Sequence, residues 1–180
     1  MSTRCLHAIY CDDVRQENTG KLCMIGVYTG DLVVRQMPAT LPQLVLNLTA
    51  STPATEPFER IKVEVRRDDE VLLSLDSSDE TTGLTQALEN ARREAEALEN
   101  IEERVQVIRM ALHLAPFEIT KPGVLRVRME TEREGEVLRA PALRLAMREG
   151  DGAGTEPAAE GVAQRPPERD NSEEGDEKSG

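Results

Sequence analysis

The chain has 180 residues with a net charge of −12, and 38% of them are hydrophobic. This length accommodates one domain of ordinary size with some residues to spare. The acidic balance excludes the electrostatic signature of a nucleic-acid-binding protein, because neutralising phosphates requires a surplus of Lys and Arg. No apolar run approaches the roughly 18 residues that cross a bilayer, so we expect no membrane association.

The cysteines predict a reducing compartment. There are three of them, Cys5, Cys11 and Cys23, and an odd number does not build a disulfide framework. The N-terminus also lacks the apolar stretch of a signal peptide, so we expect a cytoplasmic protein. A zinc site shared with His7 is the alternative, but the cysteine spacing does not match the tight knuckles of structural zinc sites. Buried free thiols are therefore the favoured interpretation.

The N-terminal half reads as short strands separated by turn residues. The clearest one spans residues 61–66, where Ile61, Val63 and Val65 alternate with charged residues, which indicates one buried and one solvated face. The turn at residues 29–31 predicts a hairpin between its two flanking strands. The expected strands of this half lie at residues 5–11, 22–28, 32–34, 44–49, 61–66 and 71–75.

Residues 82–104 predict one amphipathic helix, because they contain no proline and their apolar residues recur at spacings of four and three. Asp79 or Thr82 is suited to cap its start. The favoured interpretation is that the apolar stripe covers an open sheet edge. The alternative is a coiled-coil seam that pairs with a second copy or a partner helix, which would make the protein a homo-oligomer. The stripe consists of Leu84, Leu88, Ala91, Ala95 and Leu98.

Strand patterns resume at residues 105–114 and continue at 125–130 and 137–147. Eight or nine short strands at turn-punctuated intervals predict a mostly-β fold, an antiparallel β-sandwich of immunoglobulin-like or C2-like type with one inserted amphipathic helix. Only four aromatic residues are present and Trp is absent, so we expect a core of Leu, Val, Ile and Met. The predicted sandwich domain covers residues 1–148.

Residues 149–180 contain ten acidic and three basic residues and almost no large aliphatic ones. Such a composition predicts a disordered acidic C-terminal tail. Just before it, the chain carries a stripe of outward arginines at positions 126, 128, 144 and 148. One hypothesis is that the tail folds back over this stripe. The alternative is a solvated sheet face in which the arginines have cross-strand partners such as Glu130.

From roughly Cys5 to Met147, the sequence resembles a family of small uncharacterised bacterial β-sandwich proteins. That family has no assigned activity, so the resemblance implies a fold and no function. The long helix and the acidic tail look like additions to it. The residues that carry the resemblance are the run from His7 to Arg15, Gly20-Lys21, Ile25 to Gly30, Ala39 to Pro42, Pro57-Phe58 and Pro116 to Gly123.

The first strand is followed by Asp12, Asp13, Arg15 and Glu17. Clustered carboxylates suit calcium, which takes six to eight oxygen ligands, and the aspartates at positions 31, 68 and 69 are possible further ligands. However, no D-x-D-x-D-G loop exists and Arg15 offsets the charge. A structural ion pair between Asp13 and Arg15 is therefore favoured over a metal site.

We predict no catalytic residues and no cofactor. His7 and His113 are the only histidines, and neither borders a nucleophile turn or a Gly-rich phosphate loop. The leading hypothesis is a non-enzymatic protein-interaction or structural module whose partner is a protein. Its expected contact residues are Arg15, Leu84, Leu88 and Leu98. The alternative is a metal- or ligand-binding domain organised around Asp12 and Asp13.

Overall fold

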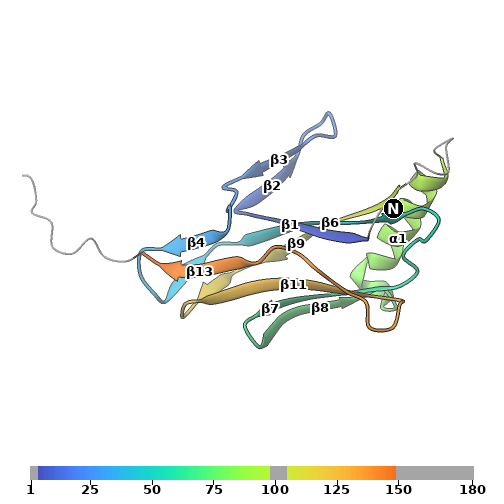
Figure 1. Cartoon of the computed structure of the whole chain (residues 1–180). Coiled ribbons are helices and arrows are strands. Elements are labelled where there is room, and N and C mark those ends of the chain that lie inside the picture. Colours follow the sequence, from blue (N-terminus) through green and yellow to red (C-terminus); the bar gives the residue numbers. More distant parts are fainter. Residues whose placement is uncertain (1–3, 98–104, 149–180) are drawn as a thin grey trace, which may run out of the picture. The chain divides into compact units, whose positions relative to one another are not determined.

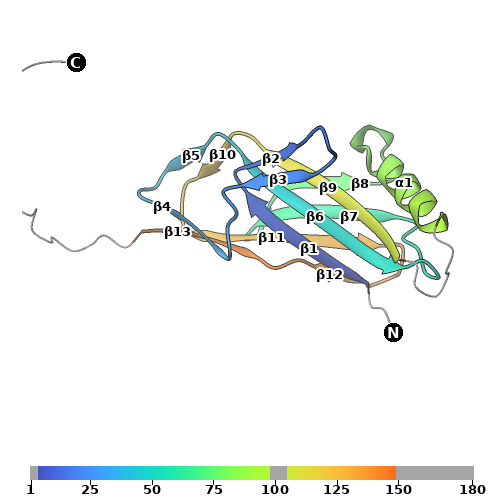
Figure 2. The same cartoon turned by 90° about the horizontal axis from the view of Figure 1, so that it is seen from above.

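The computed structural model describes residues 4–97 and 105–148. These residues form thirteen strands, one α-helix and one 3-10 helix. The strands build two larger, mainly antiparallel sheets that lie face to face, with two small strand pairs at their periphery (Figures 1 and 2). The predicted mostly-β fold with one helix and sandwich-like packing is confirmed.

The three-stranded sheet contains β1 (Cys5–Cys11), β6 (Leu44–Pro53) and β9 (Val105–Leu114) in the order β1-β6-β9. Both ladders are antiparallel, and β6 pairs with β9 over its whole length. The first predicted strand matches β1 from end to end. β6 extends beyond the predicted residue 49, because every residue from Leu44 to Pro53 has a partner on β9.

The six-stranded sheet has the order β4-β13-β11-β7-β8, and β12 pairs with the same edge of β11 as β13 does. Only the β13–β4 ladder is parallel. The strand predicted at 137–147 is divided, because Pro141 has no N–H and interrupts the pairing to β11. The strands are β4 (Asp31–Val34), β7 (Ile61–Arg67), β8 (Glu70–Asp76), β11 (Gly123–Thr131), β12 (Val137–Arg139) and β13 (Leu143–Met147).

The hairpin predicted across residues 29–31 is wrong. Gly26 adopts a φ of 66°, which ends the strand after Ile25, and the Tyr28 N–H donates to the Tyr10 carbonyl at 2.8 Å. The chain is therefore drawn back towards β1 before β4 begins. Instead, β3 (Leu22–Ile25) forms a hairpin with β2 (Asp13–Gln16), a strand that the sequence did not predict.

A second small pair joins β5 (Ala39–Leu41) to β10 (Phe117–Ile119). Neither strand was predicted. Each has only three residues, and prolines flank them at positions 38, 42 and 116, so no alternation could develop.

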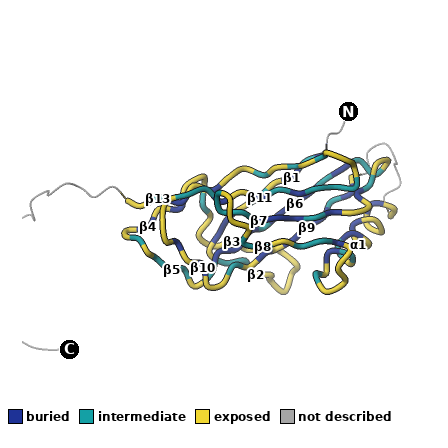
Figure 3. Tube along the Cα trace, turned by 90° about the horizontal axis from the view of Figure 1, so that it is seen from below, coloured by how far each residue is buried: buried dark blue, intermediate teal, exposed yellow. Residues whose placement is uncertain are grey.

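The core lies between the two larger sheets, where the inward side chains of both form one cluster. β6, β7 and β11 contribute most of the residues that are wholly buried (Figure 3). The expected aliphatic core is found, but three of the four aromatics are also in it: Tyr10, Phe58 and Phe117. Phe58 is the largest fully buried side chain.

The helix α1 (Leu84–Glu96) follows the 3-10 helix η1 (Glu80–Thr82) and connects β8 to β9. These are the edge strands of the two sheets on one side of the sandwich, and α1 packs against β9 there (Figure 2). Asp79 caps η1 by accepting a hydrogen bond from the Thr81 N–H, whereas α1 begins after Gly83 without a side-chain cap. Within the part of the chain that the structure describes, no helix has the length and apolarity to cross a bilayer.

Two predictions fall on residues outside the described ranges. The predicted helix extends to residue 104, whereas the structure describes α1 only to Glu96 and resumes at Val105. Leu98 lies in that gap. The predicted tail at 149–180 lies beyond the last described residue, Arg148.

Candidate functional site

The outer face of the six-stranded sheet carries a hollow lined by four arginines, which we call the arginine hollow. Its volume is about 540 Å³. The arginines come from three adjacent strands: Arg66 from β7, Arg126 and Arg128 from β11, and Arg139 from β12. The other lining residues are Asp68, Asp69, Val127, Ala140 and Ala142.

Strand alternation explains why these arginines point outward. On β7 and β11 the buried apolar residues occupy alternate positions, so Arg66, Arg126 and Arg128 lie on the opposite face. The hollow forms where the chain leaves the β11 edge between β12 and β13. The small side chains of Ala140 and Ala142 leave space at this break.

A hydrogen bond from inside the sandwich fixes the segment between β12 and β13. The Tyr10 hydroxyl, on β1 of the opposite sheet, donates a hydrogen bond of 2.8 Å to the Pro141 carbonyl. Tyr10 is buried, and this burial raises its pKa to about 12. The hydroxyl is thus protonated at neutral pH and able to donate this bond.

The sheet register places like charges directly opposite each other in the hollow. Arg126 pairs with Arg66, and Arg128 pairs with Arg139. Directly opposed like charges destabilise a sheet. The sheet therefore carries an arrangement that an anion in the hollow would relieve.

One carboxylate neutralises part of this charge. Glu64 lies opposite Arg128 on β7 and accepts two hydrogen bonds from it, at 2.9 and 2.6 Å. Lys62 lies 3.0 Å from the other carboxylate oxygen, and Arg66 lies 3.6 Å from the oxygen that Arg128 contacts. The hydrogen bond from Lys62, followed by the contacts with Arg128, holds the pKa of Glu64 below its ordinary value even though burial opposes this. Arg128 is thereby fixed in place.

The remaining arginines are less firmly neutralised. Arg126 is 3.9 Å from Asp68, the longest ion pair in the described part of the chain, and Asp68 also accepts from the Val124 N–H. Arg66 donates to the Asp69 backbone carbonyl at 2.8 Å. Arg139 is exposed and makes no ion pair with any described residue. When the residues paired with Arg128 and Glu64 are counted with the lining, five cations face four carboxylates, so the hollow keeps a small positive excess in a protein that is strongly negative overall.

The predicted metal ligands do not come together. Asp12 accepts a hydrogen bond from the Tyr28 hydroxyl. Asp13 pairs with Arg15 at 2.8 Å and accepts from the Gln43 amide, and the Arg15 contact lowers the pKa of Asp13. Across residues 4–97 and 105–148, no three Asp, Glu, His or Cys side chains are grouped as around a metal ion. The structural ion pair favoured from the sequence is present.

The predicted helix contacts are turned inward. Leu84 and Leu88 belong to the hydrophobic core, together with Ala91. Their apolar surface is therefore already covered within the chain, as in the favoured covering role for α1, and it is not exposed for the alternative coiled-coil seam. Arg15 is exposed on the β2–β3 hairpin, with Asp13 as its partner.

The predicted arginine stripe is divided between two places. Arg126 and Arg128 line the hollow, whereas Arg144 makes a two-pronged contact with Asp31 at 2.7 and 3.1 Å. Glu130, the partner named from the sequence, lies 3.6 Å from Arg128, and Glu64 is the closer partner. Sequence reasoning did not include Arg66 and Arg139 in the stripe. For Arg66, the available signal was its outward position in the alternation at residues 61–66.

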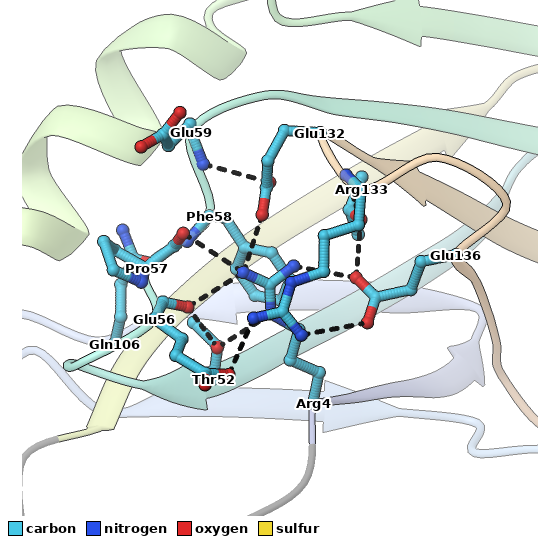
Figure 4. Close-up of polar contacts among 11 residues, drawn as sticks. Arg4, Thr52, Glu56, Pro57, Phe58, Glu59, Gln106, Glu132, Arg133 and Glu136 are labelled. Atoms are coloured by element: carbon cyan, nitrogen blue, oxygen red, sulfur yellow. Dashed lines mark hydrogen bonds and ion pairs between the residues drawn. The ribbon is translucent and has the colours of Figure 1, made fainter.

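A second arginine cluster, around Arg4, is of a different kind (Figure 4). Arg4 is only 8% exposed and its guanidinium lies 4.8 Å from the Phe58 ring centre. It contacts Glu132 at 2.6 Å and Glu136 at 2.7 Å. Its other acceptors are the Thr52 hydroxyl and the carbonyls of Glu56 and Pro57. We call these residues the Arg4 clamp.

The Arg4 clamp is internally saturated. Burial alone would lower the pKa of Arg4, but its hydrogen bonds to Glu136 and Glu132 outweigh this and raise it. Close by, Gln106 accepts from the Phe58 N–H at 2.7 Å, while its buried side-chain NH₂ has no partner among the described residues. The clamp ties the start of β1 to the β6–β7 and β11–β12 connections, which is a structural role.

Residues 6–145 match a family described as "Family of unknown function (DUF6941)". This agrees with the resemblance to an uncharacterised family read from the sequence. No curated protein and no solved structure matches the chain.

Proposed function

The chain belongs to the family of unknown function DUF6941, and we propose that it is a non-catalytic binding module whose arginine hollow holds an acidic segment of a protein partner. The observation that carries this proposal is the convergence of four arginines in one hollow, as two directly opposed pairs. Arginine clusters are a recurrent means of recognising acidic motifs, because the guanidinium presents paired donors that fit a carboxylate.

The geometry favours an extended segment with acidic residues at alternate positions. Arg126 and Arg128 are two residues apart on β11, which separates them by about 7 Å along the strand. An extended peptide repeats its side chains on one face with the same period. Glutamates or aspartates at positions i and i+2 of the partner would therefore meet successive arginines.

A nucleic acid fits the site less well. The lining residues include no aromatic side chain on which a base could stack. The net charge of −12 also repels a long polyanion, whereas a short acidic segment meets mainly the local field of the hollow.

The test is a fluorescence anisotropy titration of the full chain with a labelled peptide of alternating glutamate and serine. We expect saturable binding that weakens as salt is raised, because the contact is between charges. The double variant R66Q/R126Q should bind at least about tenfold more weakly, since two charge-assisted contacts are lost.

The matched control is R15Q/R144Q, which removes the same charge from two exposed arginines that pair with aspartates outside the hollow. Its affinity should stay close to that of the wild type. Equal weakening by both double variants would show a general charge effect and refute the site. Tighter binding of an oligothymidine strand than of the peptide would refute the choice of a protein partner.

A further inference from the structure

The β2–β3 hairpin projects from the outer side of the three-stranded sheet (Figure 1). β3 consists of Leu22, Cys23, Met24 and Ile25, four consecutive apolar residues of which none is buried. Leu22 is 49% exposed and Ile25 is 41% exposed. An exposed apolar strand at a sheet edge invites pairing with another strand, which monomeric proteins usually prevent with charges or proline.

The hydrogen-bond pattern identifies which backbone groups of β3 are free to pair. The Glu17 N–H donates to the Lys21 carbonyl, so this pair is hydrogen-bonded within the hairpin. Because hydrogen-bonded and non-hydrogen-bonded pairs alternate, the pair Arg15–Cys23 is also bonded, and Leu22 and Met24 direct their N–H and C=O groups away from β2. In the described part of the chain, β3 pairs with no strand except β2.

We propose that this edge pairs with β3 of a second copy, antiparallel and around a two-fold axis. The register follows from the two outward residues: Leu22 bonds to Met24 of the second copy, and Met24 to its Leu22. Cys23 then lies on the axis, opposite Cys23 of the second copy at a non-hydrogen-bonded position. The two hairpins become one four-stranded sheet, which is more stable than an isolated two-stranded hairpin.

The charges of the hairpin permit a second copy to approach. Asp13 and Glu17 are balanced by Arg15 and Lys21, so the hairpin is neutral although the chain carries −12. The apolar strand is also complementary to itself, as a two-fold interface requires. The hairpin extends from the three-stranded sheet, whereas the arginine hollow is on the outer face of the other sheet. The dimer is therefore independent of the proposed function.

The position of Cys23 gives a direct test of the register. Opposed residues at a non-hydrogen-bonded position have Cα atoms about 4.5 Å apart, within the range of a disulfide. Copper–phenanthroline should join two copies through Cys23: the two thiols release two protons, and their two electrons reduce two Cu(II) ions. We expect a dimer on a non-reducing gel, and a peptide map showing Cys23 joined to Cys23. A dimer joined through Cys5 would overturn the register.

The mass in solution tests the interface itself. Analytical ultracentrifugation of the reduced full chain should show a monomer–dimer equilibrium, and L22K should raise the dissociation constant at least about tenfold because a lysine ammonium would lose water at the edge. The matched control V33K alters an apolar residue of similar exposure, 54%, on β4 and should leave the constant unchanged. C23S should abolish the cross-link and keep the dimer. A wild type that stays monomeric at high micromolar concentration, or an L22K variant that dimerises normally, would overturn the proposal.

Discussion

The Arg4 clamp and the arginine hollow use the same side chain in opposite ways. In the clamp, one buried guanidinium has carboxylates, carbonyls and a hydroxyl around it, so its donors are used within the chain. In the hollow, four guanidiniums share the ion-paired carboxylates of Glu64, Asp68 and Glu130, less than one for each arginine, and stand opposite one another across the strands. The comparison indicates that the number of hydrogen-bond acceptors per arginine, rather than the number of arginines, distinguishes a structural cluster from a surface that can bind a ligand.

The largest expected effect is in the clamp. R4A should lower the free energy of unfolding by about 3 kcal/mol, because it leaves the partly buried Glu132 without its cation, leaves Glu136 with only the Arg133 cation at 3.7 Å, and removes the contact with Phe58. Urea denaturation checks this. The control R15A removes an arginine that is exposed and contacts a single aspartate, so its unfolding curve should nearly overlay that of the wild type. If R4A and R15A lost equal unfolding free energy, the buried Arg4 clamp would be no more stabilising than an exposed ion pair.

R4A should also change how the free energy of unfolding depends on pH. The fold lowers the pKa of Glu132 and Glu136, in part through Arg4. A carboxylate with a lowered pKa stabilises the fold above its ordinary pKa of about 4.3, and this stabilisation is lost as pH falls through the lowered value. The unfolding free energy of R4A should therefore fall less than that of the wild type on acidification. Parallel pH profiles would argue against the carboxylate contacts.

An intermediate effect is expected at Glu64, which brings a clamp-like contact into the hollow. E64Q should lower the unfolding free energy by about 2 kcal/mol, because Arg128 and Lys62 lose a largely buried charged acceptor. It should also strengthen binding of the acidic peptide, since the hollow becomes more positive. Denaturation and anisotropy titration measure the two quantities separately. Loss of both stability and affinity in a folded variant would show that Glu64 positions Arg128 for the ligand.

The smallest stability effect is expected at Arg139. R139Q removes an exposed arginine that faces Arg128 and has no ion pair among the described residues, so stability should stay constant or rise by up to about 0.5 kcal/mol. Affinity for the acidic peptide should nevertheless fall. A destabilised R139Q would mean that Arg139 supports the fold, which would weaken the comparison between the two clusters.

The sequence predicted what depends on local alternation and left out what depends on pairing between distant segments. The inward and outward residues of β7 and β11 follow from the period of two at Ile61–Arg67 and Gly123–Thr131, so Arg126 and Arg128 were placed correctly. That Arg66 and Arg139 flank them depends on the register between three strands, which no local pattern contains.

No local pattern in the sequence indicates the Arg4 clamp. Arg4 precedes the first predicted strand, and its carboxylate partner Glu136 is 132 positions away. The parallel pairing of β4 with β13 has the same origin, since the Arg144–Asp31 contact spans 113 positions. The β2–β3 hairpin was missed for another reason: Asp13 and Arg15 were interpreted as part of a charged cluster after the first strand, although they pair with Ile25 and Cys23 of β3 in a ladder.

The bond from Tyr10 to Pro141 gives the hollow an optical reporter. The protein has no tryptophan and two tyrosines, so its near-ultraviolet emission comes from Tyr10 and Tyr28 alone. Tyr10 reaches across the sandwich to the loop that forms one wall of the hollow. In a Y28F protein, a ligand that shifts this wall would change the hydrogen bond of the single remaining fluorophore. Binding of unlabelled compounds could then be screened by the fluorescence of Tyr10.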